Sequence, residues 1–300
     1  MPDRQTEDQH PAAPGLQSLA PQAALVHLLD AQLLAAAALR AALPGLADAA
    51  TLASSTLRSG GKLGYAGAGS SGLMALADCL ELAGTYGIAP SRTPMLFAGG
   101  AAALLHMTGS VEDDPALARA DFTRAGIAQG DAVICISASG RTPYTLAIAE
   151  AARACGASVI GIANVPDSAL LRLADIAILL DTGAEVIAGS TRMGAGTAQK
   201  IALNMLSTLM AMQLGHVQDG FMVNLTADNT KLRARARHIV ARLAQVDETR
   251  AEAALQATGG EVKTAVLVAA GATDATDATL LLADSDGHLG PALAALLTKE

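Results

Sequence analysis

Three short segments of the chain combine glycine with serine or threonine in a way that suits anion binding. They read GAGSSG at 67–72, SASGRT at 137–142, and GSTR at 189–192, the last continuing to Gly196 and Thr197. Glycine lets the backbone approach an anion closely, and the hydroxyl groups add donors without the bulk of a lysine. These residue types predict a site for a small phosphorylated ligand.

Serine is also an ordinary helix N-cap, so one such segment alone would be weak evidence. All three segments precede predicted helices, and the first two directly follow predicted strands. Ligands bind at the carboxyl edge of a parallel sheet, where helix amides also point at them. We therefore expect the three segments to form one site.

The first segment also has the spacing G-x-G-x-x-G, which is typical of a dinucleotide-binding loop. Such a loop requires an acidic residue about 20 residues further on, at the end of the second strand, to hold the ribose hydroxyls. Here that strand is expected at 94–98 and is followed by Gly99 and Gly100. The missing acid argues against a nicotinamide or flavin, and we expect no cofactor.

Two glutamates lie close to these segments in the sequence. Glu81 is on the helix expected after the first segment, and Glu112 lies in the string VEDD at 111–114. By pattern alone each could be an ordinary surface carboxylate, and the spacing does not show that the two meet.

The elements that position these residues lie between about 61 and 215, where short apolar runs alternate with helical stretches. The runs are continuous rather than alternating, which is typical of parallel strands buried on both faces. They cover 63–66, 94–98, 132–136, 159–163 and 176–180. The helices expected between them cover 71–84, 100–108, 143–155, 168–173 and 197–214. This pattern predicts a three-layer α/β domain with about five strands.

Helical sequence flanks this domain on both sides. Residues 1–21 are rich in Pro, Gln and Asp and are expected to be poorly ordered, and 21–57 predicts two helices broken at Pro44 and Gly45. After Met222 five short helices are expected, at 232–246, 247–258, 261–270, 274–282 and 288–297. We divide the chain into N-terminal tail and helices (1–57), an α/β domain (58–220) and a helical bundle (221–300).

The net charge of −8 argues against a general affinity for nucleic acid or for an anionic membrane. The basic residues at 231, 233, 235 and 237 are two apart, so they spread around a helix and favour a solvated surface over a nucleic-acid site. The apolar runs are shorter than the roughly 18 residues that a membrane span needs. The N-terminus resembles neither a signal peptide nor an anchor.

The cysteines and histidines give no sign of a metal site. Cys79, Cys135 and Cys155 lie in apolar segments and form no C-x-x-C pair, which fits buried, reduced thiols in a cytosolic protein. No two of the six histidines have the spacing that places two ligands on one helix face. We expect a cytoplasmic protein without bound metal.

Longer strings around these residues resemble a known family. They are GAGSSG followed by Asp78 and Glu81, VED at 111–113, ISASGRTPY at 136–144, and above all GSTRMGAGTAQKIALNMLST at 189–208. Together they are similar to the N-acetylmuramic acid 6-phosphate etherases, which are sugar-isomerase (SIS) domain proteins. The likeness runs from Thr6 and Glu7 to the C-terminal helices, and it implies a SIS domain at 58–220.

The resemblance implies cleavage of the lactyl ether at C3 of the 6-phosphorylated sugar, without metal or nucleotide. In the ring-opened sugar the C2 proton is α to an aldehyde, so a carboxylate can remove it. The ether oxygen then leaves if an acid protonates it, and water adds to the unsaturated aldehyde. Two carboxyl groups in opposite protonation states suffice for this chemistry.

The resemblance also implies roles for individual residues. Glu81 matches the acid that protonates departing lactate, and Glu112 matches the base at C2. The sugar phosphate is then expected to contact Ser137, Ser139, Gly140 and Thr142, with Ser70 and Ser71 on the sugar and Ser190 as a further contact.

A continuous helix from Ser71 to Glu81 would place this carboxylate roughly 15 Å along the axis, at about 1.5 Å per residue. A hexose phosphate is shorter than that. We therefore expect Glu81 to serve a sugar held mainly by another loop, in the partner subunit of a homodimer. SIS relatives are commonly dimeric, with the site at or near the subunit interface.

The chain departs from the family pattern at 8–32, at Leu73, where an arginine is usual, and at Gly194, where a lysine is common. Two other functions remain open. One is a regulator that binds a sugar phosphate without cleaving it, resembling the glucokinase regulatory protein. The other is a SIS isomerase. Retention of both Glu81 and Glu112 favours the etherase, because a sensor needs neither acid nor base.

Overall fold

The computed structural model describes residues 6–298, which form two compact units. The first comprises residues up to 79 together with 91–207, and the second comprises 80–90 together with residues from 208 onward. Helices α3 (Gly69–Tyr86) and α8 (Gly194–Gln213) each begin in the first unit and end in the second.

The first unit is built on a five-stranded parallel sheet with the strand order β2-β1-β3-β4-β5. The strands are β1 (Leu63–Gly67), β2 (Met95–Phe97), β3 (Ala132–Ile136), β4 (Ser158–Ala163) and β5 (Ile176–Leu179). Every residue of β1 and β3 is buried, whereas the edge strands β2 and β5 are partly covered. The continuous apolar runs therefore predicted the strands correctly, because both faces of the sheet are covered.

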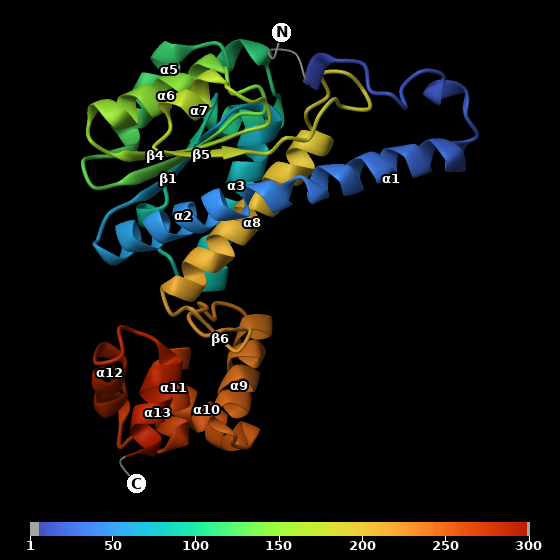
Figure 1. Cartoon of the computed structure of the whole chain (residues 1–300). Coiled ribbons are helices and arrows are strands. Elements are labelled where there is room, and N and C mark those ends of the chain that lie inside the picture. The colour runs from blue at the N-terminus through green and yellow to red at the C-terminus, as the bar shows by residue number, and fades with distance from the viewer. Residues whose placement is uncertain (1–5, 299–300) are drawn as a thin grey trace. The chain divides into compact units, whose positions relative to one another are not determined.

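Helices cover both faces of this sheet (Figure 1), so the predicted three-layer α/β fold is confirmed. Helices α5 (Pro115–Ala125), α6 (Pro143–Ala154) and α7 (Ala169–Leu173) pack on one face, and α2 (Leu39–Arg58) packs on the other. Of the twelve largest fully buried side chains among the described residues, only Tyr65 and Tyr144 are aromatic, and the core is filled mainly by Ala, Val, Leu and Ile.

The two N-terminal helices differ from the prediction in where they break. α1 (Pro21–Ala37) gives way to α2 at Ala38, and Pro44 lies inside α2. A proline costs a helix one backbone hydrogen bond. Burial of the apolar face of α2, including Leu46 and Leu57, offsets that loss. Gly45 lies on the face of α2 that packs on the sheet, where a Cβ would be in ordinary contact with Ile178 at 3.4 Å.

Helix α5 was not predicted, although its ends carry ordinary signals. The Asp114 side chain accepts hydrogen bonds from the amides of Ala116 and Leu117, and Pro115 takes the first helical position. Gly126 ends the helix with a left-handed backbone (φ +59°). The preceding helix, α4 (Gly100–Leu105), is shorter than expected.

The second unit consists largely of short helices, as expected. They are α9 (Thr230–Ala244), α10 (Glu248–Ala257), α11 (Val262–Ala270), α12 (Ala275–Ala283) and α13 (Leu289–Leu297). Asn229, Asp247 and Asp274 cap α9, α10 and α12 with their side chains. A two-stranded hairpin, β6 (Val217–Gln218) with β7 (Phe221–Met222), precedes these helices and was not predicted.

The N-terminal segment is more ordered than predicted. Thr6 is buried and its carbonyl oxygen accepts a hydrogen bond of 2.9 Å from the Gly189 amide. Leu16–Ser18 forms a 3-10 helix, while residues 1–5 lie outside the described part of the chain. Within residues 6–298 no single helix meets the length and hydropathy needed to cross a membrane, although two bent pairs, α1 with α2 and α11 with α12, meet them jointly.

Candidate active site

The strand order of the first unit reverses between β1 and β3, and this creates the point at which ligands bind in open α/β sheets. The chain leaves β1 through residues 67–72 and leaves β3 through residues 137–142. The two loops are joined by a hydrogen bond of 3.2 Å, in which the Ala138 amide donates to the Ser71 hydroxyl. The structure therefore brings the first two predicted segments together.

The glycines of the first loop are needed for close packing. A Cβ on Gly67 would lie 2.9 Å from the Cα of Gly72, and a Cβ on Gly72 would lie 2.7 Å from the ring of Phe97. These contacts account for two glycines of the G-x-G-x-x-G spacing without any dinucleotide.

The second loop is a compact ring of hydroxyl groups. The Ser137 hydroxyl lies 2.8 Å from the Thr142 hydroxyl and accepts a hydrogen bond of 3.1 Å from the Gly140 amide. The Ser139 hydroxyl accepts a weaker one from the Arg141 amide. Gly140 has a left-handed backbone (φ +62°), and a Cβ there would overlap Ser168. Such a cluster of hydroxyl groups is suited to an anion.

Glu112 lies against the first loop. Its Oε1 atom would be only 2.6 Å from a Cβ placed on Gly69, and its backbone oxygen accepts a hydrogen bond of 3.0 Å from the Tyr144 amide. Burial, and then the nearby charge of Asp113, raise the pKa of the Glu112 carboxyl above its ordinary value. A half-buried carboxylate with a raised pKa is a stronger base than one in water.

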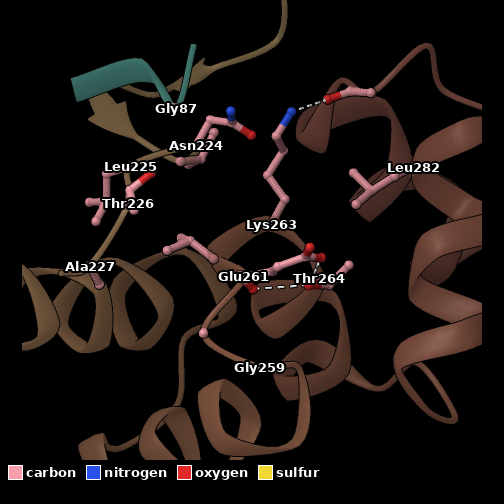
Figure 2. Close-up of a pocket in the computed structure, with 14 residues that line it drawn as sticks. Gly87, Asn224, Leu225, Thr226, Ala227, Gly259, Glu261, Lys263, Thr264 and Leu282 are labelled. Atoms are coloured by element: carbon pink, nitrogen blue, oxygen red, sulfur yellow. Dashed lines mark hydrogen bonds between the residues drawn. The ribbon is translucent and has the colours of Figure 1, made fainter. Parts of the chain in front are cut away.

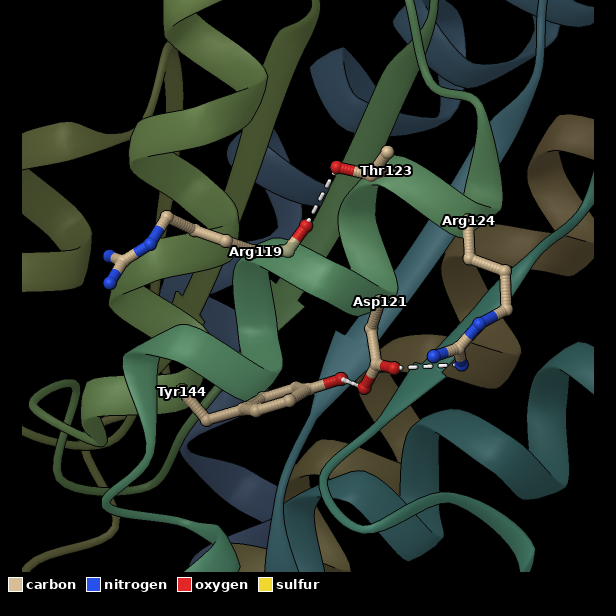
Figure 3. A network of polar contacts seen from close by, with 5 residues as sticks. All are labelled: Arg119, Asp121, Thr123, Arg124 and Tyr144. Atoms are coloured by element: carbon tan, nitrogen blue, oxygen red, sulfur yellow. Dashed lines mark hydrogen bonds and ion pairs between the residues drawn. The ribbon is translucent and has the colours of Figure 1, made fainter.

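Tyr144 also contacts the helix that follows Glu112. Its buried hydroxyl donates a hydrogen bond of 2.6 Å to Asp121 of α5, and Asp121 forms an ion pair of 2.9 Å with Arg124 (Figure 3). Tyr144 thus contacts both the backbone of Glu112 and α5, and it links this segment to the start of α6.

The third segment is held chiefly by Glu185, a residue that the sequence did not point to. Glu185 is buried, and its carboxylate accepts hydrogen bonds of 2.8 Å from the amides of Gly194 and Ala195 at the start of α8. A Cβ on Gly189 would lie 2.6 Å from Oε2 of Glu7. The backbone hydrogen bonds of Ser190 run to Ile187 and Met193, within its own loop.

A buried amide pair connects the second loop to α8. The backbone N–H of Asn164 donates a hydrogen bond to the Ala138 carbonyl oxygen. The side-chain oxygen of Asn164 accepts a hydrogen bond of 2.9 Å from the side-chain nitrogen of Gln199. Both side chains are fully buried, and Oε1 of Gln199 has no hydrogen-bond partner among the described residues. A polar residue directly after a buried strand was the available sequence signal for Asn164.

The first half of α3 is fixed by Asp78. This buried carboxylate accepts hydrogen bonds from the Tyr65 hydroxyl (3.0 Å), the Asn204 amide (2.9 Å) and the Ser207 hydroxyl (2.9 Å). Burial raises the pKa of Asp78, although these hydrogen bonds oppose the shift. The contacts hold α3 against β1 and α8.

The structure thus groups most of the predicted residues at one edge of the sheet. Ser70 and Ser71 stand at the start of α3, opposite the loop with Ser137, Ser139, Gly140 and Thr142. Glu81 lies further along α3, in the part that belongs to the second unit, with an exposed side chain. Among residues 6–298, no three His, Cys, Asp or Glu side chains gather in a way that could hold a metal ion.

Comparisons with known proteins agree with this geometry. A family model described as "SIS domain" matches residues 30–164. A relative from Deinococcus radiodurans, named N-acetylmuramic acid 6-phosphate etherase, is 42% identical over 285 residues, which cover 95% of this chain and 93% of the relative. This chain belongs to the N-acetylmuramic acid 6-phosphate etherase family.

A further relative supports the same assignment, and one solved structure shares the fold. A relative of the same name from Streptomyces avermitilis is 45% identical over 79% of this chain and 76% of its own. A phosphoheptose isomerase from Francisella tularensis has a TM-score of 0.50 and 19% identity, and covers 65% of this chain and 100% of its own. At that identity the isomerase shows a shared fold alone, whereas the etherase relatives extend along most of the chain.

Proposed function

We propose that the protein cleaves the D-lactyl ether of N-acetylmuramic acid 6-phosphate and releases N-acetylglucosamine 6-phosphate and D-lactate. Membership of the etherase family supports this reaction, and one structural observation carries it. That observation is the placement of the half-buried Glu112 carboxylate against Gly69 of the first loop, which a hydrogen bond from Ala138 to Ser71 joins to the second loop.

The phosphate group is bound by the second loop in this proposal. Ser137, Ser139 and Thr142 offer hydroxyl donors, and Gly140 allows the left-handed turn that closes the ring. Ser70 and Ser71 then contact the sugar, and Ser190 adds a further contact. A ring of neutral donors suits a phosphate that must be released after turnover.

Glu112 acts as the base in this proposal. It takes the C2 proton of the ring-opened sugar, whose acidity comes from the neighbouring aldehyde. Burial and the charge of Asp113 raise its pKa, which increases its basicity. The electron pair from C2 forms the double bond to C3 as the ether oxygen leaves.

Glu81 acts as the acid in this proposal and protonates the departing lactate oxygen. Water then adds at C3 of the unsaturated aldehyde and gives a proton to the Glu81 carboxylate, while Glu112 returns its proton to C2, which restores the saturated sugar. No metal or nucleotide is needed in these steps, because two carboxyl groups in opposite protonation states move both protons.

We also propose that the enzyme works as a homodimer with its site at or near the subunit interface, Glu81 serving the partner's sugar. The exposed apolar face of α1 supports a self-contact. Leu25, Leu29 and Leu33 are spaced four residues apart and are 63%, 58% and 59% exposed. A second copy of the chain would cover them.

Sedimentation analysis tests this dimer. Leu29→Glu combined with Leu33→Glu is expected to yield monomers, whereas Leu280→Glu, at a leucine 60% exposed in the second unit, is the matched control. Dimers that persist in the double variant would show that α1 is not the interface.

The proposed setting is the cytoplasm and the recycling of cell-wall amino sugars. Three free cysteines support a reducing compartment, since Cys79 and Cys135 are buried and Cys155 is half-buried, all without disulfide partners among residues 6–298. Burial raises the pKa of Cys79 to about 11 and of Cys135 to about 12, so both are inert thiols.

The direct test of the reaction is to incubate the protein with N-acetylmuramic acid 6-phosphate and to measure D-lactate. Stoichiometric lactate is expected. Binding of the sugar phosphate without any lactate at high protein concentration would instead identify a non-catalytic sugar-phosphate sensor.

A further inference from the structure

The second unit contains a cavity of about 560 Å³ that the proposed reaction does not use. It lies between the segment 223–227, the start of α11 and the loop at Gly287, and Gly87 closes one side (Figure 2). All of these residues belong to the second unit.

Lys263 supplies the positive charge of this cavity. Its Nζ atom donates a hydrogen bond of 2.9 Å to the Gly287 carbonyl oxygen. Two of the three N–H donors of the ammonium group therefore remain available to a ligand. Figure 2 shows the ammonium group and the Asn224 side chain pointing toward one another across the cavity. The Asn224 amide nitrogen donates to the Tyr86 carbonyl, so its oxygen is the atom left for a ligand.

No carboxylate neutralises Lys263 within residues 6–298. Glu261 also lines the cavity, but its carboxylate accepts a hydrogen bond of 3.3 Å from the Thr264 hydroxyl. Burial lowers the pKa of Lys263 to about 8, and the pKa of His216 falls to about 4 through burial and then the charge of Lys263. His288 is a further basic group beside His216.

A half-buried ammonium group without a counterion is unfavourable, and an anion in the same cavity would relieve that cost. We propose that this cavity binds a small anion bearing a phosphate or carboxylate group, held by the Lys263 ammonium group, with the Asn224 oxygen accepting from a ligand hydroxyl. The site is independent of the etherase reaction.

The test follows the Lys263 side chain by NMR in the full-length protein labelled with [ε-13C]lysine. The chain has five lysines, so the spectrum is simple. The Lys263 signal is assigned as the one lost in Lys263→Met. If that variant does not fold, substitutions of Lys62, Lys200, Lys231 and Lys299 identify the signal by exclusion.

The titration midpoint of Lys263 is measured in chloride alone, with inorganic phosphate, and with acetate, all at one ionic strength. An anion that binds beside the ammonium group should raise the midpoint by about one unit. The signal of Lys231, on the exposed start of α9, should not shift. A response to phosphate alone identifies a phosphate ester as the ligand class, and a response to acetate alone identifies a carboxylate. An unchanged Lys263 midpoint with both anions would overturn the proposal.

Discussion

The carboxylate of Glu112 occupies the space in which any side chain at position 69 would have to stand. Oε1 of Glu112 lies 2.6 Å from the Cβ position of Gly69, and the Gly69 backbone is left-handed (φ +53°). The glycine therefore both forms the turn after β1 and leaves room for Glu112.

Substitution of Gly69 by alanine should displace this carboxylate. We expect kcat to fall about a hundredfold or more, since a shift of about 1 Å at a reacting group has that effect. The left-handed backbone should add a loss of roughly 1–3 kcal/mol in the free energy of unfolding. Steady-state kinetics and urea unfolding measure the two effects.

Gly130→Ala is the matched control for this substitution. Gly130 also has a left-handed backbone (φ +87°), but a Cβ there meets no atom within 4 Å. It should lose stability while keeping kcat. Equal losses of kcat in both variants would mean that backbone strain, and not the displacement of Glu112, reduces turnover.

The pH profile of kcat/KM should respond to Asp113. Burial comes first and the Asp113 charge second in raising the pKa of Glu112, so Asp113→Asn should lower that pKa. A base works only when ionised, and the acidic limb of the profile should therefore move to lower pH. Asp113→Glu keeps the charge and should leave the limb in place. A limb that moves to higher pH in Asp113→Asn would contradict Glu112 as the base.

Removal of the Tyr144 hydroxyl should make the position of the segment around Glu112 less well fixed. Tyr144→Phe leaves Asp121 paired with Arg124 but deletes the buried hydrogen bond, at a cost of about 1–2 kcal/mol in the free energy of unfolding. We expect a several-fold lower kcat with KM unchanged. Asp121→Asn keeps an acceptor for the hydroxyl and should retain activity. A change in KM alone would place Tyr144 in substrate binding instead.

Glu185 should contribute to stability through the start of α8. Its two short hydrogen bonds to backbone amides replace the bonds that the first turn of a helix lacks. Glu185→Ala should therefore lower the free energy of unfolding by about 2 kcal/mol or more. Glu248→Ala, on an exposed acidic residue in the first turn of α10, is the control. Equal losses of unfolding free energy in the two variants would show that the Glu185 hydrogen bonds stabilise the protein no more than an ordinary exposed carboxylate does.

Much of the fold could be predicted because burial on both faces leaves continuous apolar runs in the sequence. The strand at 132–136 was predicted to the residue, and the five C-terminal helices to within about two residues. The loops after β1 and β3 could be predicted to meet, because parallel strands end at one edge. The break at Pro44 was wrong because local propensity was overridden by packing of α2 on the sheet.

The contacts that complete the site left no local signal. Glu112 reaches Gly69 only because α4 and the turn after it carry the chain back from β2 to β1. Glu185 looks like any loop carboxylate in the sequence. Its carboxylate caps α8 only because the chain folds back on the start of that helix. Such contacts depend on tertiary structure, and the hydrophobic pattern of the sequence does not predict them.

The proton at C2 of the sugar tests the central proposal most directly. The protein, Glu81→Gln and Glu112→Gln are incubated with N-acetylmuramic acid 6-phosphate in D2O, and both D-lactate release and deuterium at C2 are measured. We predict that Glu81→Gln loses lactate release but still exchanges the C2 proton, and that Glu112→Gln loses both. Near-normal turnover or C2 exchange in Glu112→Gln would show that Glu112 is not the base.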